Sequence, residues 1–417
     1  MDTNGRALIY LGSHNEVDQI SPIVYKLGER GNIAVDVVLE SSVAPGDYRI
    51  RAINRYDSVT TCNIGPTNSQ LSTTDRISKL VKDVGRKVPT DIPEKVYDRF
   101  VQSSDHMSIP NQFSNNVYDL VAFDWTNAKG ERAIRFANND DLTTIVLPHG
   151  DSPFINNIET QDMSNIFIEN DSYSTRHVAQ NEIGYPPYDE FLKYDHITFP
   201  NNMTADRMPR DAPECQINVF GSPRYNSEWL DVLSEIRPRD QIQTDAEINL
   251  VFFLRRGGYF ISEDEVINTL KLLNQFDNVS TIAKEHPRKQ LLSPDISDKL
   301  ANIRIVQNNI SSASLIQWGD VFLSLGTTIT FEPIMRQKPV LAVEYAHANY
   351  SVVSDYFSNA DLCTKEDLYH TIHNFLVDGT QNFYDERSHQ RFVDEVVSPN
   401  EDPVLDSWAA FIESRCQ

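Results

Sequence analysis

Short apolar runs alternate with amphipathic segments along most of this sequence. A run of consecutive apolar residues predicts a strand buried on both faces, and apolar residues three or four positions apart predict a helix. Strands are predicted at 6–11, 33–39, 117–123, 143–147, 165–169, 196–199, 216–220, 248–254, 279–283, 303–306, 320–325 and 340–343. Helices are predicted at 20–27, closed by Gly31, and at 76–84, 129–137, 228–236, 263–276, 312–318, 350–357, 365–376 and 383–415. This alternation is typical of α/β domains, in which helices connect parallel strands.

The alternation falls into two series, which predict two domains. A chain of 417 residues is too long for one ordinary core, and a polar segment at 237–245 separates the two series. We expect a Rossmann-like domain at 1–225, a linker at 226–247, a second Rossmann-like domain at 248–380, and helices at 381–417 that pack back on the first domain. The predicted fold class is α/β, with two doubly wound domains facing a cleft.

Composition and charge exclude several classes of function. The net charge of −23 leaves no surplus of cations to bind a nucleic-acid backbone, so no nucleic-acid partner is expected. The four cysteines are scattered singly, which predicts neither a disulfide framework nor a CxxC metal site. The sequence shows no signal peptide and no apolar run of membrane-spanning length. We expect a cytoplasmic protein whose association with the inner face of the membrane, if any, is peripheral.

The stretch 321–343 predicts a strand, a glycine turn, a helix and a second strand. A helix N-terminus carries unpaired N–H groups and a partial positive charge, so Gly326, Thr327 and Thr328 are candidates to receive a phosphate. Glu332, one turn later, could accept hydrogen bonds from a ribose or a base. The alternative is an ordinary crossover in which a threonine caps the helix.

Three predicted strand ends in the second series carry charged or polar groups. Because the carboxyl ends of parallel strands share one edge of a sheet, these groups should converge there. They are Arg255 and Arg256, then His286 and Arg288, then Thr327 and Thr328. Cations, a histidine and a helix N-terminus together predict a pocket for the phosphates of a nucleotide donor. The alternative for the segment 284–289 is a solvated turn.

In the first series, His149 follows the predicted strand 143–147. An imidazole is a competent base at neutral pH, so His149 is the candidate to take a proton from an acceptor hydroxyl. The alternative is a loop histidine with local hydrogen bonds. Two other histidines, His370 and His373, have helical spacing but no accompanying carboxylate motif, so we expect no metal site. The first turn also lacks the GxGxxG fingerprint of nicotinamide and flavin enzymes.

An ordered set of short motifs resembles a known family. They are Leu147-Pro148-His149-Gly150, Phe220-Gly221-Ser222-Pro223-Arg224-Tyr225-Asn226, His286-Pro287-Arg288, and Gly326-Thr327-Thr328 before Lys338-Pro339. Over nearly the whole chain the sequence is similar to two-domain GT-B glycosyltransferases, most of all the group of CDP-glycerol glycerophosphotransferases and capsular-polysaccharide transferases.

The resemblance implies a transferase of surface-polysaccharide biosynthesis with a nucleotide-linked donor and a glycan or lipid-linked acceptor. It implies that the second domain binds the donor and that His149 acts as the base, with Gly150, Arg224 and Gly326 lining the cleft. It also implies that no metal or other cofactor is needed. The transferred group is a sugar or glycerophosphate.

Two other functions remain open. One is a non-hydrolysing nucleotide-sugar 2-epimerase, which would use carboxylates such as Asp119, Asp124 and Glu332. The other is a non-catalytic nucleotide-binding protein of a polysaccharide pathway.

Overall fold

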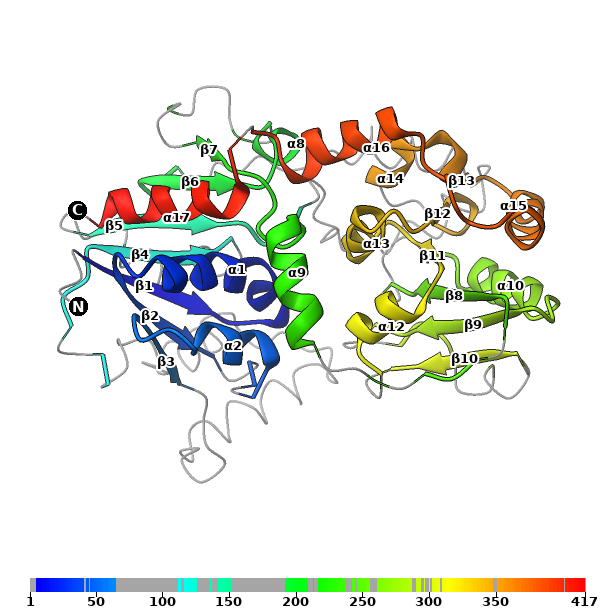
Figure 1. Cartoon of the computed structure of the whole chain (residues 1–417), viewed down its shortest axis with the longest axis horizontal. Coiled ribbons are helices and arrows are strands. Elements are labelled where there is room, and N and C mark those ends of the chain that lie inside the picture. The colour runs from blue at the N-terminus through cyan, green and yellow to red at the C-terminus, as the bar shows by residue number, and fades with distance from the viewer. Residues whose placement is uncertain are drawn as a thin grey trace, which may run out of the picture. The chain divides into compact units, whose positions relative to one another are not determined.

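Two β-sheets organise the chain (Figure 1). The computed structural model describes residues 5–40, 43–44, 46–64, 112–113, 116–125, 136, 142–151, 192–206, 208, 213, 217–237, 240, 242–244, 246–255, 261–286, 290–293, 296, 300, 302–307, 310–347, 351–400 and 402–416. The predicted helices 76–84 and 129–137, apart from Phe136, and the predicted strand 165–169 lie outside these residues.

The chain divides into two compact units. The first contains Met1–His149, Lys193–Ile197 and Trp408–Gln417, and the second contains Gly150–Leu192 and Thr198–Ser407. The last residues of the chain thus belong to the same unit as the first. The domain boundaries predicted at 225, 247 and 380 stay predictions.

The first sheet has seven strands in the order β3-β2-β1-β4-β5-β6-β7. The strands from β1 to β6 run parallel to their neighbours. Their bounds are β1 Arg6–Leu11, β2 Ala34–Leu39, β3 Val59–Asn63, β4 Leu120–Asp124, β5 Thr143–Leu147, β6 His196–Phe199 and β7 Ile217–Val219. Strand β3, at the edge of the sheet, is missing from the sequence prediction.

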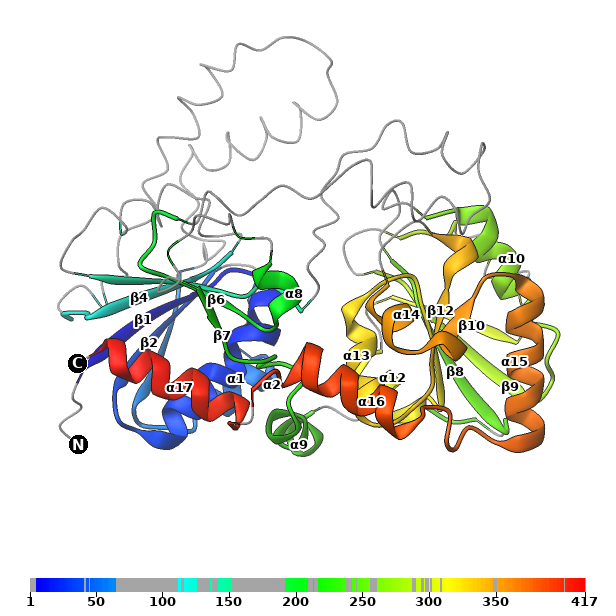
Figure 2. The same cartoon turned by 90° about the horizontal axis from the view of Figure 1, so that it is seen from above.

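Helices α1 (His14–Arg30), α2 (Tyr48–Ile53) and α17 (Val404–Arg415) lie on one face of the first sheet (Figure 2). Ser13 caps the start of α1, and Gly31 ends the helix as predicted, with a φ of 63° that favours glycine. In the last part of the chain, the Glu413 carboxylate of α17 binds Arg30 of α1 at 2.9 Å. Helix α8 (Asn202–Ala205) is a single turn.

The second sheet has six parallel strands in the order β10-β9-β8-β11-β12-β13. Their bounds are β8 Ile248–Phe253, β9 Val279–Lys284, β10 Ile303–Val306, β11 Val321–Ser324, β12 Val340–Val343 and β13 Asp361–Leu362. Counted from its own first strand, this order repeats that of the first six strands of the first sheet. The predicted fold class, α/β with two Rossmann-like domains, is confirmed.

Helices cover both faces of the second sheet, and alternate residues of its strands enter two cores. Leu250 and Phe252 of β8 pack in one core with α10 (Glu263–Leu273) and α15 (Lys365–Asp378). Val251 and Phe253 pack in the other core. The elements there include α12 Ser312–Trp318, the 3₁₀ turn η4 Thr328–Thr330, α13 Phe331–Met335, α14 Val352–Tyr356, α16 Glu386–Phe392 and the π-helical turn η7 Val393–Val397. Helix α9 comprises Ser227–Ile236. Short 3₁₀ turns, η5 Glu344–Ala346 and η6 Ser358–Ala360, follow β12 and α14.

The C-terminal segment differs from its prediction. Residues 383–415 form α16, η7 and α17 with a break after Val397, where one helical segment was expected. Pro403 follows the break and favours a new helix start, because proline fits the first turn of a helix. Among the described helices, none is both long enough and apolar enough to cross a membrane.

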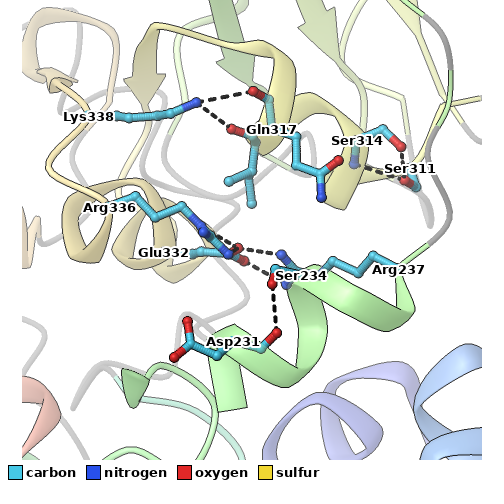
Figure 3. Close-up of polar contacts among 10 residues, drawn as sticks. Asp231, Ser234, Arg237, Ser311, Ser314, Gln317, Glu332, Arg336 and Lys338 are labelled. Carbon is cyan, nitrogen blue, oxygen red and sulfur yellow. Dashed lines mark hydrogen bonds and ion pairs between the residues drawn. The ribbon is translucent and has the colours of Figure 1, made fainter. Parts of the chain in front are cut away.

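Lys338, of the Lys338-Pro339 pair, fixes the end of helix α12. Its ammonium donates to the carbonyl oxygens of Ile316 at 3.0 Å, Gln317 at 3.2 Å and Gly319 at 2.6 Å. Figure 3 shows Lys338 with Gln317. These carbonyls end the helix and have no partner within it. Burial lowers the pKa of Lys338, with the nearby Asp320 acting in the opposite direction. The lysine therefore has a structural role in the crossover between β11 and β12.

Replacing Lys338 by methionine should destabilise the protein by about 2 kcal/mol, because three carbonyls lose a charged donor while the apolar stem is kept. The measurement is the urea midpoint of unfolding. Lys271→Met, at an exposed position on α10, is the control and should change stability by less than about 0.5 kcal/mol. Equal midpoints for the two variants would contradict the role of Lys338.

Candidate functional site

In each sheet the strand order reverses beside the first strand of its series. The reversal lies between β1 and β4 in the first sheet and between β8 and β11 in the second. Helices on the two sides of such a point lead away to opposite faces, which leaves the carboxyl ends of the strands open to a ligand. Polar residues at these four strand ends are therefore the first candidates for function.

In the first sheet, His149 and Asp124 form a hydrogen-bonded pair. Asp124 is the last residue of β4, and His149 lies two residues after the neighbouring strand β5. His149 Nδ1 lies 2.8 Å from Asp124 Oδ2 and 3.0 Å from Oδ1. The Asp124 side chain is fully buried, whereas that of His149 is 29% exposed. One end of the ring is thus held inside the protein, and part of the ring reaches the surface.

This pairing selects the tautomer of His149. An ionised carboxylate only accepts hydrogen bonds, so Nδ1 of the neutral ring must carry the proton and Nε2 the lone pair. Asn15 Nδ2 lies 3.4 Å from Nε2 and is a donor, which agrees with this assignment. An imidazole oriented in this way can accept a proton at Nε2 while Asp124 stabilises the resulting imidazolium.

Glu16 is a second buried carboxyl group near this pair. It lies in the first turn of α1, directly after β1, and is 2% exposed. The N–H of Gly12 donates to its Oε2. Burial, and then the negative charge of Asp124, raise the pKa of Glu16 to about 7, while the hydrogen bonds of Gly12 and Ser13 and the charge of His149 act in the opposite direction.

In the second sheet, Arg255 bridges the reversal point. It follows β8, and its guanidinium donates to the carbonyl oxygens of Leu325, at 3.3 Å, and Gly326. Both carbonyls lie in the turn after β11, where Gly326 has a φ of 73°. Arg255 therefore holds the shape of the turn that the sequence singles out, because two of its carbonyls are fixed by one cation.

The helix after this turn is shorter than predicted. Thr328–Thr330 form a 3₁₀ turn, and the α-helix comprises only Phe331–Met335. Thr327 donates its N–H to Ser324 Oγ at 3.3 Å, and Thr330 Oγ1 donates to the carbonyl of Thr327 at 2.7 Å. So short a helix carries a weak dipole, so a phosphate bound there would depend mainly on N–H groups, hydroxyls and cations.

Glu332 lies between two arginines (Figure 3). Arg237, directly after α9, donates to both carboxylate oxygens, at 2.7 Å for Oε2, and Arg336 Nε donates to Oε1 at 3.1 Å. Glu332 is 3% exposed. Its carboxylate is thus engaged inside the second unit, and binding to a ribose or base stays a prediction.

The other predicted residues are placed as follows. His286 lies two residues after β9, partly buried, beside Glu285, whose carboxylate accepts from the N–H groups of Leu291 and Leu292 at 2.9 Å each. The guanidinium of Arg224 lies over the ring of Tyr225 at 4.9 Å. Gly150 faces open space at the position of a Cβ atom. Arg256 and Arg288 lie outside the described residues.

Solved structures with the same architecture cover almost the whole chain. A UDP-GlcNAc 2-epimerase from Neisseria meningitidis, bound to UDP-GlcNAc, has a TM-score of 0.50 at 10% identity, with 98% of this chain and 99% of that chain covered. The glycotransferase of kitacinnamycin has a TM-score of 0.54 at 10% identity, with both chains fully covered. A UDP-glucosyltransferase from Polygonum tinctorium has a TM-score of 0.52 at 9% identity, with 99% and 98% covered. The chain has the GT-B fold.

GT-B is an architecture shared by several activities, and identities near 10% show the fold alone. No protein-family model and no curated protein sequence matches the chain. The fold therefore leaves the function open, and the polar groups at the two reversal points carry the information about it.

The sequence interpretation missed two members of the polar group in the first GT-B domain. It considered Asp124 only for an epimerase and did not pair it with His149, and it did not single out Glu16. A signal existed for Asp124, because it ends a buried strand just as His149 follows one. Glu16 lies in the polar segment after the first strand, where its side-chain direction could not be read from spacing.

The raised pKa of Glu16 predicts a pH-dependent contribution to stability. Between about pH 4.5 and 7 the folded state holds a proton that the unfolded state releases, so stability falls as the pH rises through this interval. Glutamine cannot ionise, so Glu16→Gln does not show this loss. Its free energy of unfolding relative to that of the wild type should therefore increase from pH 5 to pH 8. At 1.36 kcal/mol per pKa unit, the gain is on the order of 3 kcal/mol.

The check is urea unfolding at pH 5 and pH 8. Glu29→Gln, with a 45% exposed side chain on the same helix, is the control and should show a much smaller change. A difference between Glu16→Gln and wild type that does not grow with pH would contradict the protonated state of Glu16.

Proposed function

We propose that this protein is a glycosyltransferase or glycerophosphotransferase that moves a group from a nucleotide-activated donor to an acceptor hydroxyl. The observation that carries the proposal is the His149–Asp124 pair, in which Nδ1 is bound to a buried carboxylate and Nε2 is left as the proton acceptor. A histidine held in this way is suited to general-base catalysis. The GT-B fold supports it, since the similar structures include a glycotransferase and a UDP-glucosyltransferase.

His149 removes the proton from the acceptor hydroxyl in the proposed reaction. The acceptor oxygen forms a bond to the anomeric carbon of a sugar donor, or to phosphorus if glycerophosphate is transferred. The bond between that atom and the oxygen of the leaving nucleotide breaks, and its electron pair passes to the nucleotide. The proton moves to Nε2, and the positive charge on the ring is stabilised by Asp124.

The second GT-B domain supplies the donor contacts in this proposal. The backbone and hydroxyl groups of Thr327 and Thr328 and the ring of His286 bind the phosphates, with Arg256 and Arg288 as further cations. Arg255 keeps the Gly326 turn in shape. Uracil is the first choice of base, because the similar structures described above include an epimerase bound to UDP-GlcNAc and a UDP-glucosyltransferase, and cytosine is the second.

The finer assignments follow from the resemblance of the motifs. The acceptor is a glycan or lipid-linked glycan of a capsular or related surface polysaccharide. The reaction proceeds without a metal ion, in the cytoplasm, with any membrane association peripheral. A 2-epimerase is the second candidate, because the similar structures include such an enzyme and two buried carboxyl groups, Asp124 and Glu16, lie near His149.

The tests of turnover use UDP-sugars and CDP-glycerol with and without polysaccharide acceptors. A transferase consumes the donor rapidly only with an acceptor, whereas an epimerase converts a UDP-sugar alone. His149→Ala should lower kcat by about 10²–10⁴, and Asp124→Asn should also lower it, because the asparagine no longer fixes the tautomer. The control is His373→Ala, at an exposed position on α15. Full turnover by His149→Ala would reject His149 as the base.

Nucleotide binding is tested separately, by thermal shift with UDP, CDP, GDP and CMP. The cognate nucleotide should raise the Tm, because a ligand that binds only the folded state stabilises it by mass action. His286→Ala should reduce the shift, and His149→Ala should leave it unchanged. If no nucleotide raises the Tm, the donor assignment fails, and if His286→Ala keeps the full shift, the phosphate role of His286 fails.

A further inference from the structure

Three neighbouring strands bring Glu16, Asp124 and His149 to one edge of the first sheet. The strands are β1, β4 and β5, which are adjacent in that order. Glu16 follows β1, Asp124 ends β4 and His149 follows β5. All three residues belong to the first compact unit.

The first turn of α1 contacts His149 through one residue and holds the Glu16 side chain through others. Ser13 caps the helix, and Gly12 donates its N–H to the Glu16 carboxyl group, which fixes that side chain. The preceding residue, Asn15, extends its amide to Nε2 of His149 at 3.4 Å. The position of Glu16 relative to the ring is therefore set by well-defined local contacts.

Two acidic groups and one base share this buried region. The charged groups that act on Glu16 are Asp124, which disfavours its ionisation, and His149, which favours it. On the α2 side of α1, the guanidinium of Arg49 is bound by Asp18 and, at 2.6 Å, by Asp47. A negative charge on Glu16 therefore favours the protonated form of His149.

We propose that Glu16 is a positioning residue of the base, and that the charge of this buried carboxyl group beside the His149–Asp124 pair sets the basicity of His149. The inference rests on the proposed function. With Glu16 neutral, Asp124 stabilises the imidazolium. With Glu16 ionised, a second negative charge stabilises it, and His149 binds a proton more strongly.

The burial of Glu16 supports this proposal. A carboxyl group with a pKa of about 7 is a mixture of both forms at neutral pH, so its charge responds to small changes in the surroundings. Because the two groups interact, they should titrate as a pair with broad, overlapping curves.

The test is an NMR titration of the His149 ring in the wild type and in Glu16→Gln. Glutamine keeps an oxygen that accepts from Gly12 but cannot ionise. The His149 midpoint should fall by about one pH unit in the variant, a tenfold loss of proton affinity. Glu29→Gln should leave the midpoint at its wild-type value. An unshifted midpoint in folded Glu16→Gln would overturn the proposal.

If Glu16→Gln does not fold, the wild type labelled with ¹³C-glutamate is titrated instead. A carboxyl signal with a midpoint near pH 7 that changes together with the His149 ring is expected, and its absence overturns the proposal. The titration requires no substrate. A shifted midpoint without turnover on any donor would therefore reject the proposed function alone, and turnover with an unshifted midpoint would reject the role of Glu16 alone.

Discussion

The reversal of strand order beside the first strand of each series determines where polar side chains can gather in this protein. At the other strand ends of a doubly wound sheet the connecting helices cover the edge, whereas the connections from the two strands at the reversal lead to opposite faces and leave the edge open. In the first sheet this position holds Gly12, Glu16 and Asp124, and in the second it holds Arg255 and Gly326. The two positions differ in charge, with acids at the first and a guanidinium at the second. In the proposed function, the same topology serves a proton acceptor in one domain and an anion in the other.

At the reversal point of the first sheet, the main cost in free energy is the burial of charge. Asp124 is fully buried, and its negative charge is tolerated because His149 lies 2.8 Å away. Burial of Glu16, and then the negative charge of Asp124, raise the pKa of this second carboxyl group to about 7. His149 thus interacts with two carboxyl groups, by a hydrogen bond with Asp124 and through its charge with Glu16.

Much of the fold could be predicted from the sequence because strands buried on both faces read as continuous apolar runs. The run 248–254 and the run 143–147 both became central strands of their sheets. Edge strands lack this signal. In β3, Val59 is buried but Thr60 and Asn63 are exposed, so nothing in the pattern distinguishes it from a loop. His149 could be identified because it follows such a run, whereas its pairing with Asp124 depends on the adjacency of β4 and β5, which no local pattern reveals.

The ion pair of Glu332 could not be predicted from a local pattern either, since its partner Arg237 is 95 positions away in the sequence. It also concerns the segment predicted as a linker. Arg237 binds Glu332, and Asp240 accepts from the N–H of Ser311 at 3.0 Å. The segment is therefore part of the electrostatic environment of the second sheet. A fragment that began at Ile248 would leave Glu332 with Arg336 alone, so nucleotide binding measured on it would examine a carboxylate in a different charge environment from that in the full chain.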